Sequence, residues 1–193
     1  MPTNTDTDTD ARPTVTVEDR PADSYPRRTL LVDFLFLDRD RCDRCRGTEA
    51  SLHEALERLE PIFDVLDVEV VVRNVHVTSE VAARRTRLES SPTVRIDGRD
   101  VQPAFDESSC ETCGDLCSAE AGINCRTWTY RGEQHAQAPP DLLLEALLRA
   151  ALSPRDRARS APREPYRVPE NLQRFFGDDG SGPPAAERTD PCC

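Results

Sequence analysis

The sequence predicts an α/β fold, in which strands and helices alternate along a single domain. The first observation is the near-continuous apolar run at residues 30–37, which is typical of a central strand covered on both faces. The second is a Cys-Asp-Arg-Cys motif at residues 42–45, after which apolar residues recur at helical spacing as far as Pro61. The third is a valine-rich run at residues 68–77, which has the composition of a buried parallel strand. The fold is therefore expected to begin with a strand, a helix and a second strand.

The remaining elements are expected in the order helix, strand, strand, helix. Residues 79–88 predict a short charged helix, and residues 94–97 predict a strand that directly follows Pro92. Residues 126–131 alternate in polarity, so we expect this segment to pair with the strand at 94–97. Asp141 is expected to cap the last helix. The predicted order is β-α-β-α-β-β-α.

Length and composition fit one domain with polar tails. The chain has 193 residues, and residues 29–152 are expected to form the domain, preceded by a disordered acidic tail at residues 1–28. A cysteine-rich insertion at residues 99–124 separates the last two predicted strands. Residues 153–193 are rich in Pro, Arg, Asp and Gly and are expected to be largely disordered. Within them, residues 166–176 are a candidate docking element.

Charge and hydropathy exclude two classes of partner. The chain contains 25 basic residues, all of them arginine, against 36 acidic residues, for a net charge of −11. This balance argues against nucleic-acid binding, which rewards basic patches. The N-terminus lacks the features of a secretory signal, and no apolar run approaches the ~20 residues that span a bilayer. We therefore expect a cytoplasmic protein, in which the eight cysteines are catalytic or metal-binding rather than a permanent disulfide framework.

The motif at residues 42–45 can act as a redox dithiol. Two thiols separated by two residues can close a small disulfide ring, and the positive end of the helix that follows favours the thiolate. Cys42 is expected to be the nucleophile, and Cys45, one turn inward, is expected to resolve the mixed disulfide. The partners of such a site are protein or small-molecule thiols and disulfides.

These motifs resemble the thioredoxin-like superfamily, and within it a small prokaryotic family catalogued as a domain of unknown function. The resemblance covers about residues 29–152 and is carried by four segments, at residues 42–48, 91–98, 110–125 and 125–128. It implies a thioredoxin-like fold whose cysteine-rich insertion lies between the last two strands. It also implies that Pro92 is cis and packs against the active-site cysteines.

A second cysteine group consists of Cys110, Cys113, Cys117 and Cys125. These residues admit three chemistries: a tetrahedral zinc site, two disulfides, or thiolate binding of a soft metal or metalloid. In the minimal thioredoxin-like core, the loop that joins the last two strands lies at the opposite end of the sheet from the CxxC motif. The two cysteine groups are therefore expected to be separate sites.

The chain also contains an adjacent pair, Cys192 and Cys193. Thiols on a mobile tail suit chelation of thiophilic ions such as Hg(II) or As(III), and the alternative is a dispensable tail. Taken together, the sequence predicts a thiol–disulfide oxidoreductase with Cys42, Cys45 and Pro92 at its centre. One alternative is a protein that binds zinc or another thiophilic ion. A second alternative is a non-catalytic interaction module that docks through residues 166–176.

Overall fold

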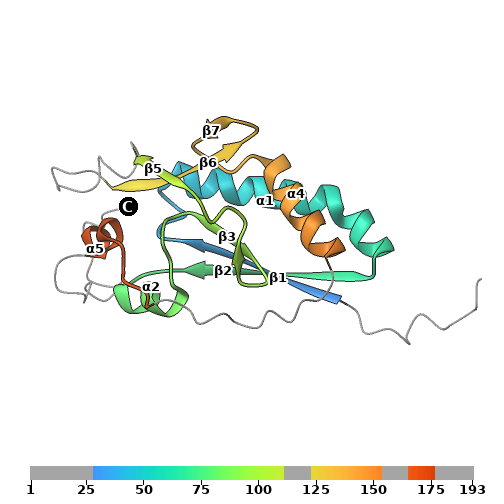
Figure 1. The fold of residues 1–193 in the computed structure, drawn as a ribbon, viewed down its shortest axis with the longest axis horizontal. Helices are drawn as coiled ribbons and strands as arrows, with labels where there is room; N and C mark the ends of the chain where they lie inside the picture. The colour runs from blue at the N-terminus through green and yellow to red at the C-terminus, as the bar shows by residue number, and fades with distance from the viewer. Residues whose placement is uncertain (1–27, 111–122, 154–164, 177–193) are drawn as a thin grey trace, which may run out of the picture.

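The computed structural model describes residues 28–110, 123–153 and 165–176, which form a mixed α/β fold (Figure 1). Residues 1–27 of the tail predicted at residues 1–28, and residues 111–122 of the cysteine-rich insertion, lie outside the described residues, whereas Arg28 already belongs to the first strand. In chain order the described elements are β1 (Arg28–Phe36), α1 (Asp43–Val65), β2 (Val68–His76), α2 (Glu80–Thr86), β3 (Thr93–Ile96), β4 (Arg99–Asp100), β5 (Asp106–Ser109), β6 (Asn124–Tyr130), β7 (Glu133–His135), α4 (Pro140–Leu152) and α5 (Glu170–Phe176).

The main sheet has four strands in the order β2-β1-β3-β4. Strands β1 and β2 are parallel and stay in register from Arg28 opposite Val68 to Phe36 opposite His76. The prediction that these two strands are adjacent and parallel is confirmed, but the expectation of a buried second strand was wrong, because β2 lies at the edge of the sheet and has exposed residues along it. Strand β3 pairs antiparallel with the other edge of β1. The apolar run of β1 therefore occupies the centre of the sheet, where Leu30 and other side chains have no solvent exposure.

Helices α1 and α4 lie side by side on one face of this sheet (Figure 1). Their inward positions are apolar: Leu52 on α1 and Leu143 on α4 are each 1% exposed. Each such side chain contributes about 1.5 to 3 kcal/mol by leaving water. At the far end of α4, the Arg28 guanidinium donates hydrogen bonds to the carbonyl oxygens of Ala150 and Ala151, which belong to the last turn, where carbonyl groups have no i+4 amide within the helix. This contact ties the start of β1 to the end of α4.

Two predicted helix boundaries were wrong. Helix α1 does not end near Pro61 but continues to Val65, with the proline inside the helix. Proline removes one backbone donor, but the extra turn buries Phe63 to 5% exposure, which offsets that loss. At α4, Asp141 is a first-turn residue, and the cap position is taken by Pro139. A carboxylate in the first turn still complements the helix dipole.

The second sheet has the order β5-β6-β7 and differs from the prediction. Residues 126–131 were expected to pair with the strand at residues 94–97, but β6 pairs instead with β5 and β7. The reason is a tight turn at Asp97 and Gly98, whose positive φ angles of 50° and 76° reverse the chain after β3. Because of that reversal, β4 pairs with β3 and takes the edge position of the main sheet.

The two sheets are joined by a buried arginine. The Arg126 side chain, in β6, has 0% exposure and makes an ion pair with Asp100 of β4 at 2.9 Å. Its guanidinium also donates to the Thr93 hydroxyl at 2.7 Å and lies over the rings of Phe105 and Trp128, at 4.5 and 4.6 Å from their centroids. One charged side chain thus holds β6 against β3 and β4.

The segment at residues 166–176 packs on the protein's own domain. Leu172 of α5 has 0% exposure, and the Tyr166 hydroxyl donates a hydrogen bond to a backbone carbonyl in the connection between α2 and β3. The Asn171 side chain accepts from the Asn124 backbone amide at 3.0 Å and donates to its carbonyl at 2.6 Å. The candidate docking element therefore already has an intramolecular partner, at the start of β6. None of the described helices has the length and apolar character needed to cross a membrane.

Replacing Arg126 with methionine is expected to lower the free energy of unfolding by about 3 to 5 kcal/mol, because it leaves the Asp100 carboxylate without its buried cation. Urea denaturation of the two proteins measures this difference. The matched control is Arg58→Met, which breaks an ion pair with Asp141 between two half-exposed side chains and should cost less than about 1 kcal/mol. Equal losses in the two variants would contradict the assignment of Arg126 as the junction of the sheets.

Candidate functional site

Three cysteines from three separate segments converge in the interior. Their sulfur atoms, on Cys42, Cys110 and Cys125, all lie within 4.8 Å of one another. The three side chains are buried, with exposures of 2%, 2% and 3%. Four sulfurs bound to a tetrahedral zinc ion at ~2.3 Å stand about 3.8 Å apart, so these three need only a small movement to share one ion. We refer to them below as the cysteine trio.

The β5–β6 ladder accounts for two members of the trio. Ser108 stands opposite Cys125, and the backbone amide of Cys110 donates to the carbonyl oxygen of Ile123 at 3.0 Å. Cys125 therefore lies two residues beyond the position that faces Cys110. Residues in this diagonal relation point to the same face of a two-stranded ladder and come within contact distance.

The third sulfur is brought close by the loop that precedes β3. Cys42 is the residue that precedes the first turn of α1, just beyond the end of β1. At that end of β1, the Leu37 amide donates to the Ser91 hydroxyl at 3.2 Å, and the Ser91 carbonyl accepts from the Arg126 amide at 2.9 Å. Ser91 thus places β6 beside the start of α1, where Cys42 lies.

The expected separation of the two cysteine groups was wrong for Cys110 and Cys125. That expectation assumed a hairpin that joins the strand at 94–97 directly to the strand at 126–131, with the insertion at the far end of the sheet. Because β4 occupies the edge and β5 and β6 form their own ladder, the cysteine-bearing end of that ladder lies at the CxxC motif.

Cys45 is a neighbour of the trio. It is 1% exposed, and its sulfur lies 3.7 Å from the Ser91 hydroxyl oxygen. The pKa of the Cys45 thiol is raised well above its usual value. The larger cause is a hydrogen bond with Cys42, and burial is the second. The Ser91–Pro92 peptide bond is cis, as predicted, and Pro92 is buried. Of these two residues, it is Ser91 that hydrogen-bonds to Cys45.

Arginines around the motif have different partners. Arg39 forms an ion pair with Glu49 at 2.8 Å, and Arg46 forms one with Asp43. These carboxylates offset part of the positive charge near Cys42. Arg44 differs, because its hydrogen bonds go to backbone carbonyls and a serine hydroxyl in β5 and β6.

Four of the predicted ligands belong to segments other than those that the structure describes. Cys113, Cys117, Cys192 and Cys193 lie outside the described residues. Within the described part of the chain, the trio is the group whose ligand atoms are close enough to share a metal ion.

Residues 30–147 match the family model described as Domain of unknown function (DUF2703). The chain belongs to this family. The match covers more than half of the 193 residues and includes the whole trio together with Cys45 and Ser91. No curated protein and no solved structure matches the chain.

Sequence reasoning missed two features of this DUF2703 domain. It did not assign Cys110 and Cys125 to the same site as Cys42, and it gave no role to the Ser91 hydroxyl. The sequence analysis had already grouped Cys110 with Cys125, and the ladder on either side of residues 111–122 brings these two cysteines together. No local pattern showed that this ladder packs on the CxxC motif rather than away from it.

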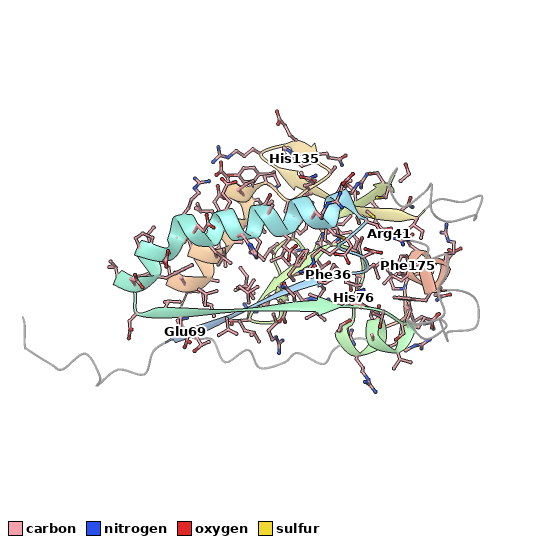
Figure 2. The ribbon with its side chains drawn as sticks, turned by 180° about the vertical axis from the view of Figure 1, so that it is seen from behind. Phe36, Arg41, Glu69, His76, His135 and Phe175 are labelled. Atoms are coloured by element: carbon pink, nitrogen blue, oxygen red, sulfur yellow. The ribbon has the colours of Figure 1, made fainter. Side chains whose placement is uncertain are left out.

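The convergence of the trio predicts disulfide formation between cysteines that are distant in sequence. In a full-length variant that keeps only Cys42 and Cys125, mild oxidation should close an intramolecular disulfide, because the two sulfurs lie within 4.8 Å. Thiol counting and peptide mapping by mass spectrometry measure it. The control keeps Cys42 and carries Glu69→Cys instead, since Glu69 lies at the opposite end of the molecule from Arg41 next to the motif (Figure 2). Equal disulfide yields in the two proteins would contradict the geometry.

Proposed function

We propose that the protein binds a thiophilic metal ion or metalloid through Cys42, Cys110 and Cys125. The observation that carries this proposal is the mutual proximity of three buried sulfur atoms. Soft sulfur ligands favour zinc, Hg(II) and As(III) over hard cations such as magnesium or calcium. This function corresponds to the metal-binding alternative of the sequence analysis, with Cys42 added to Cys110 and Cys125 and with the other four predicted ligands left out, because they lie outside the described residues.

The burial of the trio supports a role in ion binding. Three thiolates in such a small apolar volume repel one another, and burial adds the cost of removing each charge from water. A bound cation offsets both effects, because it replaces three protons and supplies the opposite charge. Burial also keeps competing hydrophilic ligands away from the ion.

Binding should depend on the trio and not on the other cysteines. We expect a full-length variant with serine at Cys113, Cys117, Cys192 and Cys193 to retain one As(III) ion per chain in native mass spectrometry. Adding Cys125→Ser to that variant should weaken binding on the order of 100-fold, since each ligand contributes a few kcal/mol of the coordination energy.

The matched control for this prediction is Cys45→Ser in the same background. Cys45 is equally buried but lies outside the trio, so its replacement should change As(III) affinity far less. Loss of binding in Cys45→Ser together with full binding in Cys125→Ser would contradict the proposal. Zinc titrated in parallel shows whether the same ligands also hold a tetrahedral ion.

A second candidate function is thiol–disulfide exchange through Cys42 and Cys45. The supporting observations are the position of Cys42 at the start of α1 and its hydrogen bond with Cys45. In this reaction the Cys42 thiolate attacks a substrate disulfide, forms a mixed disulfide and releases one substrate thiolate. Cys45 then transfers its proton to the leaving sulfur and attacks Cys42, which releases the second thiol. The substrate gains two electrons, the CxxC pair is oxidised, and a cellular dithiol must reduce it again.

The two functions make different demands on single cysteines. If exchange is the activity, Cys42→Ser should abolish reduction of a model disulfide, and Cys45→Ser should accumulate mixed disulfides because the resolving thiol is missing. Cys125→Ser should leave both behaviours intact. Insulin reduction and non-reducing mass spectrometry measure these outcomes. Equally slow alkylation of Cys42 and Cys45 in the folded protein, with no turnover, would exclude the exchange reaction.

A further inference from the structure

We propose that Arg44 is the positioning residue that assembles the cysteine trio. This inference rests on the proposed ion-binding function and assigns a role to a residue inside the CxxC motif. Arg44 lies on the first turn of α1, between Cys42 and Cys45. Its guanidinium contacts both of the strands that carry the other two cysteines.

Four hydrogen bonds define the contact. One nitrogen of the guanidinium donates to the Cys125 carbonyl oxygen at 3.2 Å, and to the Ser108 hydroxyl at 3.0 Å and the Ser108 carbonyl at 3.4 Å. The second nitrogen donates to the carbonyl oxygen of Ser109 at 2.8 Å. Ser109 is the residue before Cys110, and Cys125 is itself a member of the trio. A single side chain on the Cys42 helix therefore reaches the backbone of both other ligand segments.

The planar guanidinium suits this task. Its donors have a fixed fork geometry, so two acceptors on neighbouring strands can be held at a set spacing. A lysine ammonium is a point donor on a flexible stem and cannot fix two strands in the same way. The side chain is half-buried, which strengthens these bonds relative to fully exposed ones.

Charge provides a second contribution. None of the four acceptors carries a formal charge, so they do not neutralise the positive charge that the guanidinium places next to the trio. Arg46 differs, because its guanidinium is bound by the Asp43 carboxylate. A nearby cation lowers the cost of holding several thiolates together until the ion arrives. Arg44 thus sets both the spacing and the electrostatic environment of the three sulfurs.

The test compares Arg44→Gln with the matched control Arg46→Gln in the full-length chain with serine at Cys113, Cys117, Cys192 and Cys193. Hg(II) is the probe, because its sulfur-to-metal charge-transfer absorption distinguishes three thiolate ligands from two. We expect the background protein and Arg46→Gln to give the three-thiolate spectrum and Arg44→Gln to give the two-thiolate spectrum. As(III) affinity should fall about 10- to 100-fold in Arg44→Gln, the usual effect of removing a residue that orients metal ligands.

Arg44→Lys separates geometry from charge and also serves if Arg44→Gln does not fold. Lysine keeps the positive charge but lacks the fork-shaped donor group of arginine. We therefore expect Arg44→Lys to give the two-thiolate spectrum, as Arg44→Gln does. A three-thiolate spectrum in Arg44→Gln, or in Arg44→Lys, would overturn the positioning role. If the background protein itself shows no three-thiolate complex, the proposed function fails, which is a different outcome from a failure of Arg44 alone.

Discussion

The buried guanidinium of Arg126 is the interaction on which the arrangement of this protein depends. A charge with 0% exposure is stable only when it is paired and hydrogen-bonded, and Arg126 meets this requirement by contacting Asp100 and Thr93 of the main sheet. Because these partners lie on β3 and β4, satisfying the charge fixes the position of β6. The second sheet therefore packs beside the start of α1.

The chemistry of the site follows from that placement. Cys125 is the neighbour of Arg126, so the strand that buries the arginine also brings a thiol to Cys42, and the ladder with β5 adds Cys110. A CxxC motif that stood alone would offer two thiols for disulfide exchange. With a third and a fourth thiol at the same place, ion binding becomes the better-supported function, and Cys42 belongs to both candidate sites.

Local patterns in the sequence were sufficient for part of the structure. The pairing of the strands at residues 30–37 and 68–77 follows from short-range hydrophobicity, whereas the cis bond before Pro92 was implied by the family resemblance. The strand pairing at residues 126–131 was missed, because the turn at Asp97 and Gly98 puts β4 on the edge of the main sheet and the buried Arg126 then holds β6 against distant partners. The cysteine trio was missed for the same reason, since its members come from segments whose relative position is set by that non-local packing.

X-ray absorption spectroscopy at the arsenic edge, on the full-length protein loaded with one equivalent of As(III), tests the central claim most directly. Binding by the trio predicts a first shell of three sulfur atoms in the native protein, reduced to two in Cys110→Ser and unchanged in a variant with serine at both Cys192 and Cys193. A shell that contains oxygen in the native protein would contradict binding by three buried thiolates. A shell that loses sulfur only when Cys192 and Cys193 are replaced would show that the ion is held elsewhere.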